Sequence, residues 1–253
     1  MITDVRESRM LVVSDTHIGN HFCNARPALI RLLSYARDNG YNVCINGDGI
    51  DVLQTSVRRM SIEATSLLTE FRRAAADITI YYTVGNHDII LEHCLGDWGG
   101  VRFVPFLNVV SGGKRIRIEH GHLYDQFLMK HPDLQPELTR FIGFCARLHP
   151  RLYSLDEPIK RLRHRYIARW LGWRRRGDRP AHWPEDESPS FMEAAEELSR
   201  RGFDVVIFGH THHAGVVPLN DARASYVNPG SWFHAPHYIE IDEGAVSLKP
   251  WHG

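Results

Sequence analysis

The sequence predicts an α/β fold in which parallel strands are joined by helical crossovers. Two observations support this class. Over the first ninety residues, short apolar runs alternate with segments whose apolar residues recur at helical spacing. Five apolar runs along the chain also end in a cluster of Asp, Asn and His, as strands do when their carboxyl ends meet at one site. The length of 253 residues allows one domain, or one domain with an insertion.

The first part of the chain alternates strand and helix. Pro27 near the start of the first helical segment and Gly40 just after its end are typical helix boundaries. Cys44 lies inside an apolar run, where we expect it to be a small core residue. The expected elements are strand 10–13, helix 26–39, strand 43–45, helix 61–76 and strand 78–83.

The second part of the chain is richer in short strands. Ser111-Gly112-Gly113 predicts a hairpin turn, and Ser190 with Glu193 has the spacing of a capping box for a helix that ends at Gly202. Glu243-Gly244 is expected to join the last two strands. The expected strands are 101–106, 107–110, 114–118, 204–208, 226–227, 238–241 and 245–248.

Polar clusters follow five of these strands. Because the carboxyl ends of parallel strands meet at one edge of a sheet, we expect the five clusters to form one site. The clusters are SDTH at 14–17, NGDGID at 46–51, GNHD at 85–88, EHGH at 119–122 and GHTH at 209–212.

The donor types in these clusters predict a metal site. Carboxylate and amide oxygens are mixed with imidazoles, and there is no thiolate, which suits Mn²⁺, Fe, Zn²⁺ or Co²⁺. Seven donors are too many for one ion, so two divalent ions that share a bridging carboxylate are expected, with Mn²⁺ preferred. The expected ligands are Asp15, His17, Asp48, Asn86, His120, His210 and His212.

The order of these motifs resembles that of the calcineurin-like metallophosphoesterases. The matching motifs are D-x-H at 15–17, G-D-x-x-D at 47–51, G-N-H-D at 85–88, H-G at 120–121 and G-H-x-H at 209–212. The resemblance implies a four-layer α/β/β/α sandwich with a helical insertion. It also implies that one ion is held by Asp15, His17, Asp48 and His212, and the other by Asp48, Asn86, His120 and His210.

The same resemblance implies hydrolysis of a phosphodiester or diphosphate bond by a hydroxide that bridges the two ions. His87 would then lie near the leaving oxygen as a general acid or electrostatic stabiliser, and Asp51 would hold its ring. The alternative is that His87 is a passive residue behind the ligands. A nuclease or nucleotide phosphodiesterase of the same fold is a further alternative, and a metal-free scaffold is the non-enzymatic one.

Several other polar residues lie near the motifs. His122 is interpreted as a substrate contact or as a solvated loop residue, and Asn20 as a residue that lines the substrate pocket. Asp88 is interpreted as a hydrogen-bonding residue of its turn. Asn228-Pro229-Gly230-Ser231 is interpreted as a tight turn that closes the site.

Residues 125–200 are interpreted as a helical, basic, lid-like insertion within a single domain that spans 1–253. From 147 to 179 there are eleven Lys or Arg and three Asp or Glu, a local charge of +8. Apolar residues recur there at helical spacing, with Trp170 among them, and Arg163 is expected to contact substrate. The stripe is interpreted as core packing, as a lid or peripheral membrane contact, or as a nucleic-acid contact.

The insertion and the chain length resemble those of the branch of the family that hydrolyses UDP-2,3-diacylglucosamine, a nucleotide- and lipid-linked diphosphate. That branch has Arg where this chain has His87, and H-G-D where it has His120-Gly121-His122. The charged start MITDVRESRM and the four cysteines without a CxxC pair predict no signal peptide and a reducing compartment. The expected location is therefore cytoplasmic, with peripheral membrane contact through the insertion as an addition.

Overall fold

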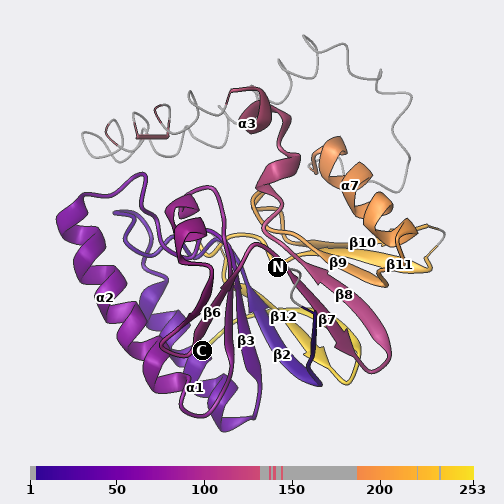
Figure 1. Ribbon diagram of the computed structural model, residues 1–253, viewed down its shortest axis with the longest axis horizontal. Helices are drawn as coiled ribbons and strands as arrows, with labels where there is room; N and C mark the ends of the chain where they lie inside the picture. Colours follow the sequence, from indigo (N-terminus) through magenta and orange to yellow (C-terminus); the bar gives the residue numbers. More distant parts are fainter. Residues whose placement is uncertain are drawn as a thin grey trace.

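Two β-sheets lie face to face with helices on their outer faces in the computed structural model (Figure 1). The structure describes residues 4–131, 137, 139–140, 144 and 187–253, apart from positions 221 and 234. The predicted mixed α/β fold with two sheets and flanking helices is confirmed. The basic segment 147–179, with Arg163 and Trp170, lies outside the described residues, so the proposed lid stays a prediction.

The larger sheet has seven strands, and its central strands are parallel. Its order is β13 (Ala245–Pro250), β12 (His237–Asp242), β2 (Arg9–Val13), β3 (Asn42–Asn46), β4 (Ile80–Thr83), β6 (Val101–Val104) and β5 (Gly96–Trp98). Strand β3 pairs in parallel with β2 on one side and β4 on the other. Helices α1 (Arg26–Asp38) and α2 (Val57–Ala74) cover the outer face of this sheet (Figure 1).

The smaller sheet has six strands in the order β1 (Asp4–Arg6), β7 (Leu107–Ser111), β8 (Lys114–Ile118), β9 (Val205–Ile207), β11 (Ala224–Asn228) and β10 (Gly215–Leu219). Strand β9 pairs in parallel with β8 and β11, although more than eighty residues separate it from β8 along the chain. Helix α7 (Pro189–Arg200) packs on the outer face (Figure 1). The short elements are η1 (Ile89–Cys94), η2 (His122–Tyr124) and α3 (Gln126–Lys130).

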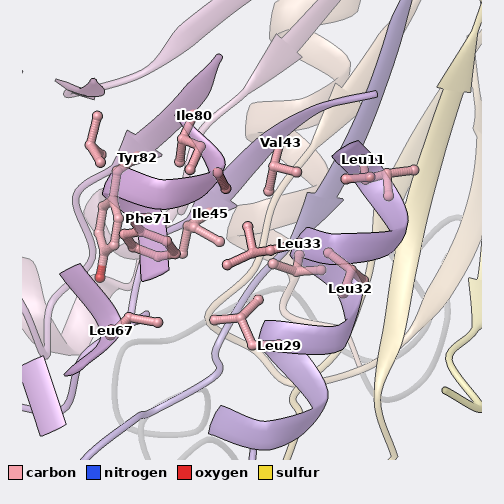
Figure 2. Packing of buried hydrophobic residues seen from close by; sticks show 14 of the residues in the cluster. Leu11, Leu29, Leu32, Leu33, Val43, Ile45, Leu67, Phe71, Ile80 and Tyr82 are labelled. Atoms are coloured by element: carbon pink, nitrogen blue, oxygen red, sulfur yellow. The ribbon is translucent and has the colours of Figure 1, made fainter. Parts of the chain in front are cut away.

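Alternate residues of the central strands face different layers of the core. Leu11 and Val13 pack toward α1 and α2, whereas Met10 and Val12 pack between the two sheets. A strand exposes successive side chains on opposite faces, so a strand covered on both faces reads as a continuous apolar run. Figure 2 shows the first of these layers, in which Leu29, Leu32 and Leu33 of α1 and Phe71 of α2 meet the strands. Cys44 is fully buried between the sheets, as expected.

Helix starts differ from the sequence expectation in two places. Helix α2 begins at Val57 rather than 61, because the side chain of Ser56 accepts a hydrogen bond from the backbone N–H of Arg59 at 3.3 Å and caps the helix. The predicted capping box at Ser190 is wrong: α7 begins at Pro189, so Ser190 is already helical, and Ser188 is the N-cap without a side-chain cap bond.

The parallel pairing brings two sets of loops to one edge of the sandwich. Strands β2, β3 and β4 are mutually parallel neighbours in one sheet, and β8, β9 and β11 are parallel neighbours in the other. The polar clusters predicted from the sequence follow β2, β3, β4, β8 and β9. Within the described ranges, no helix is both long and apolar enough to cross a membrane.

Candidate metal centre

The backbone is strained where the donor residues lie. Eight non-glycine residues in the described chain have a positive φ, and five of them are expected ligands. A left-handed conformation costs a non-glycine residue about 1–3 kcal/mol, so the surrounding structure must impose it. These residues are Asp15 (φ 53°), His17 (φ 43°), Asp48 (φ 50°), His210 (φ 65°) and His212 (φ 65°).

Three motif glycines let the backbone approach these side chains closely. A Cβ atom on Gly85 would overlap the carboxylate of Asp48, and one on Gly209 would overlap the side chains of Ser14 and Asp15. A Cβ atom on Gly47 would overlap the ring of His120. Glycine is therefore required at these positions by packing against the donors, and not by turn geometry alone.

The first group of donors consists of Asp15, His17 and His212. One ligand atom from each lies within 4.8 Å of the other two. Nε2 of His212 is 3.2 Å from Oδ1 of Asp15 and 3.5 Å from Nε2 of His17. Asp15 and His17 are buried, whereas the ring of His212 is partly exposed at the rim.

The second group consists of Asp48, His120 and His210, again with ligand atoms within 4.8 Å of one another. Nδ1 of His120 donates a hydrogen bond to the carbonyl oxygen of Asn46 at 2.9 Å. That bond fixes the tautomer and leaves Nε2 as the nitrogen that can bind a metal ion. Nε2 lies 3.4 Å from Oδ2 of Asp48.

Three buried donor atoms fit a cation that would complete their coordination. Oδ1 of Asn86 is buried and has no hydrogen-bond partner within the described part of the chain. Oδ1 of Asp15 lies 3.2 Å from Nε2 of His212, and Nε2 of His120 lies 3.4 Å from Oδ2 of Asp48, so each faces another expected ligand. Leaving a buried polar atom unpaired costs about 1–3 kcal/mol, and a bound ion would offset that cost. A divalent ion at each group would bind donors of this kind, and the donor set therefore fits a metal centre.

The pKa values of Asp48 and His120 also indicate that the carboxylates of the site favour a positive charge beside them. Burial alone would raise the pKa of Asp48, but the nearby imidazoles of His120 and His87 outweigh it and hold that pKa well below its usual range. Burial alone would lower the pKa of His120, but the carboxylates of Asp48 and Asp15 raise it to about 10. In the metal-free protein a proton on His120 thus supplies charge that a bound cation would otherwise supply.

His87 lies beside both groups and contacts Asp51. Its Nδ1 is 3.2 Å from Oδ1 of Asp51, and its backbone N–H donates to Oδ1 of Asp48 at 2.8 Å. One ring nitrogen of His87 also lies within 4.8 Å of ligand atoms of His17 and Asp48. By distance alone His87 qualifies both as a metal ligand and as the acid beside the centre, and its role stays a prediction.

Asn20 is placed behind the site. Its side-chain N–H groups donate to Asp51 at 2.7 Å and to Gln54 at 2.8 Å, while its carbonyl oxygen accepts the backbone N–H of Phe22 at 3.0 Å. The side chain is 2% exposed. The geometry therefore disfavours the predicted substrate contact, because the polar groups of Asn20 are engaged in orienting Asp51.

His122 lies next to the second group. Its ring is centred 5.6 Å from the ring of His120, and neither of its nitrogens has a hydrogen-bond partner among the described residues. Burial and the neighbouring imidazoles of His120 and His210 lower its pKa to about 3, so the ring is neutral near pH 7. A half-buried imidazole whose two nitrogens have no partner among the described residues is compatible with a substrate contact.

Asp88 and Asn228 tie the loops together. Asp88 accepts hydrogen bonds from the backbone N–H groups of Gly85 at 2.7 Å and Gly49 at 2.9 Å, which joins the loops after β3 and β4. Asn228 donates to the carbonyl oxygen of Gly209 at 3.2 Å and accepts the N–H of Gly230 at 2.8 Å. These contacts match the turn roles predicted for both residues.

Two carboxylates that sequence reasoning missed also hold the loop after β9. Asp125 contacts the ring of His210 at 3.2 Å, and Glu187 accepts the hydroxyl of Thr211 at 3.0 Å. The residues flank the segment between η2 and α7, far from His210 in the sequence. No local pattern marks them; the one usable signal is that Asp125 follows the EHGH cluster within a few residues.

The chain thus has a two-sheet α/β sandwich with carboxylate, amide and imidazole donors at its strand ends. The chain belongs to the calcineurin-like phosphoesterase family, whose sequence profile matches residues 8–214. The match includes all five motif clusters, and the resemblance noted from the sequence is confirmed.

Individual relatives are distant. A UDP-2,3-diacylglucosamine hydrolase of Stenotrophomonas maltophilia is 24% identical over 189 residues, which cover 68% of this chain and 69% of that protein. Among solved structures, a dimetal phosphatase from Danio rerio has a TM-score of 0.53 at 12% identity. The match covers 96% of this chain and 95% of the phosphatase chain. A structure of an archaeal phosphodiesterase has a TM-score of 0.48 at 16% identity, and the match covers 96% of this chain and 99% of that chain. At 12% identity the match to the Danio rerio structure shows the fold alone.

Proposed function

We propose that this protein hydrolyses phosphodiester or diphosphate bonds with two divalent metal ions, Mn²⁺ being the preferred ion. The single observation that supports this proposal most strongly is the pair of donor groups, one around Asp15 and one around Asp48, at one edge of the sandwich. The buried Oδ1 of Asn86, an expected ligand, also has no hydrogen-bond partner within the described residues, as a donor to a cation would.

The residues that would hold the ions follow from the two groups. Asp15, His17 and His212 would hold one ion, and His120, His210 and Asn86 the other, with Asp48 shared between them. Such a pair of ions would act as Lewis acids toward the phosphoryl oxygens and lower the pKa of bound water. Five of these residues have a left-handed backbone, which the surrounding structure must impose.

His87, oriented by Asp51, would donate the proton to the leaving oxygen. Oδ1 of Asp51 accepts Nδ1–H of His87, which leaves Nε2 of that ring to donate a proton to a leaving oxygen. Burial alone would raise the pKa of Asp51, but the imidazoles of His87 and His17 hold it well below the usual range, so Asp51 stays ionised. An ionised partner orients the His87 ring and favours its protonated form.

The substrate class is supported by the similarity to the Stenotrophomonas protein named for hydrolysis of UDP-2,3-diacylglucosamine. We infer a nucleotide- or lipid-linked diphosphate, with His122 beside the second donor group as the residue that contacts it. The predicted contact by Arg163 and the predicted membrane contact fall on the insertion, outside the described residues, and stay predictions.

Phosphorus NMR tests the proposal. The protein is first loaded with Mn²⁺ and then diluted for the measurement. The substrates are UDP-2,3-diacylglucosamine and an aryl phosphodiester, with Asp48→Asn as the control variant. Release of UMP, abolished by chelator and by Asp48→Asn, would support the diphosphate substrate. Cleavage of the aryl diester alone would reject UDP-2,3-diacylglucosamine as the substrate but would still support a metal-dependent hydrolase. No cleavage of either, together with no bound metal, would refute the proposed function.

A further inference from the structure

Asp125 is a buried carboxylate that contacts a donor of the second group from outside the cluster. Its side chain is 6% exposed, and its Oδ2 lies 3.2 Å from Nε2 of His210. A carboxylate accepts and cannot donate, so Nε2 of His210 carries the proton of this hydrogen bond. The remaining nitrogen of the ring, Nδ1, is then unprotonated and available to a metal ion.

The position of Asp125 is fixed by the short elements on either side of it. Its backbone N–H donates to the carbonyl oxygen of His122 at 3.1 Å, and its backbone oxygen accepts the N–H of Met129 at 3.0 Å. Its Oδ1 lies 3.4 Å from the N–H of Leu128, so the same carboxylate also caps the first turn of α3. One carboxylate oxygen is thus oriented by the helix start while the other meets His210.

The ring of His210 is held on a second side by an aromatic contact. It stacks on Phe191 of α7 with the ring centroids 5.8 Å apart and the planes 2° from parallel. The ring of His120 meets it edge-on at 5.4 Å. Stacking fixes the plane of the ring but leaves its two nitrogens interchangeable by a flip, and the hydrogen bond to Asp125 selects between them.

We propose that Asp125 is a positioning residue for the metal centre: it fixes the tautomer and orientation of His210, and so controls the affinity of one of the two metal sites and not the other. The inference rests on the two-ion centre proposed above. A carboxylate that accepts the second ring N–H of a histidine ligand also makes the ligand nitrogen more basic. Loss of such a partner reduces metal affinity about 10- to 100-fold.

Metal binding itself is the readout, independent of turnover. Metal-free wild-type protein is titrated with Mn²⁺ and followed by electron paramagnetic resonance of the free ion. Two variants separate the roles of Asp125: Asp125→Asn keeps an oxygen acceptor without the charge, and Asp125→Ser keeps a helix-capping hydroxyl that is too short to serve His210. Asp204→Asn is the matched control, because Asp204 accepts the backbone N–H of Arg115 at the opposite end of β9.

The expected result is that wild type and Asp204→Asn bind two ions. Asp125→Ser should bind one ion unchanged and the other about 10- to 100-fold more weakly, with a smaller loss for Asp125→Asn. Unchanged affinity at both sites in the two Asp125 variants, or an equal loss at both sites, would overturn the inference. Wild type that binds fewer than two ions would refute the proposed two-ion centre itself, and the inference with it.

A measurement on the wild type keeps the inference testable if an Asp125 variant fails to fold. Nitrogen-15 NMR of histidine side chains in the Zn²⁺-loaded protein reports which ring nitrogen carries a proton. His210 should show its proton on Nε2, with Nδ1 shifted by the metal. A proton on Nδ1 of His210 would contradict the proposed role of Asp125.

Discussion

Oδ1 of Asp51 lies 3.2 Å from Nδ1 of His87, and it also accepts the backbone N–H of Gln54 at 2.8 Å. The other oxygen of the same carboxylate accepts the side-chain N–H of Asn20 at 2.7 Å. Asp51 is completely buried, so both oxygens are oriented by the protein before any substrate arrives. A carboxylate held in this way can keep His87 in one orientation beside the donor groups.

The first prediction concerns His87. His87→Ala should lower kcat by a factor of about 10²–10⁴, because the variant lacks the acid proposed for the leaving oxygen. It should bind Mn²⁺ as wild type does, because the two donor groups around Asp15 and Asp48 remain complete. Turnover and metal content are measured on the same preparation, with His252→Ala, an exposed histidine near the end of the chain, as the control.

Loss of an ion from His87→Ala would show that His87 is a ligand, which its ring nitrogen is close enough to be. Wild-type turnover in the same variant would remove His87 from the mechanism. The two outcomes are distinguishable because metal content and kcat are independent readouts.

The second prediction concerns His120 and pH. Its pKa in the folded metal-free protein is about 10, above the ordinary value of 6.5. A raised folded pKa contributes stability that is fully present below pH 6.5 and is lost as the pH rises toward 10. The free energy of unfolding of metal-free protein should therefore fall between pH 7 and 8.5, by up to about 1.4 kcal/mol per pH unit for one proton.

Urea unfolding at several pH values in the presence of chelator measures this slope. His122 does not interfere above pH 7, because its pKa in the folded protein is about 3 and its ordinary value is 6.5. Mn²⁺ binding must displace the proton from His120, so metal affinity should rise over the same pH range. A slope of zero that is shared by wild type and His120→Gln would refute this linkage.

Most of the candidate site was predictable from sequence because its donors directly follow strands. Asp15, Asp48 and Asn86 come after buried apolar runs, and parallel pairing alone then brings them to one edge. The hairpin at Gly112-Gly113 was predictable for a similar reason, since its turn residues are adjacent in sequence. In each case the residues that determine the feature are close together in the sequence, and strand pairing then places them in the sheet.

The parts that sequence reasoning missed depend on contacts between distant segments. Asp125 touches His210 across 85 positions of sequence, and Glu187 touches Thr211 from just before α7. Edge strand β10 has a Pro and an exposed Val216, which give it no strong strand pattern. The substrate contact of Asn20 stays a prediction that the geometry disfavours, because a buried amide that serves Asp51 looks the same in sequence as one that faces a pocket.

The third prediction concerns Glu187, which is 3% exposed and accepts the hydroxyl groups of Thr211 at 3.0 Å and Tyr226 at 2.7 Å. Glu187→Ala should lower the free energy of unfolding by about 1–3 kcal/mol, because both hydroxyls lose a buried acceptor. Glu187→Gln keeps an acceptor oxygen and should cost less. Chemical denaturation of both variants measures the difference, and equal costs for Ala and Gln would contradict the hydrogen-bonding role.

The last prediction concerns Gly209, the second residue of the loop after β9. Gly209→Ala should destabilise the fold by about 1–3 kcal/mol and weaken metal binding, because the added Cβ overlaps Ser14 and Asp15 and forces Asp15 to move. Gly215→Ala is the matched control: it lies six residues further on, and its Cβ would have no atom within 4 Å. Thermal unfolding with and without Mn²⁺ separates the two effects, because an intact site should still raise Tm on metal addition. If Gly209→Ala and Gly215→Ala show the same Tm and the same increase with Mn²⁺, the close approach of the backbone at Gly209 has no part in holding Asp15.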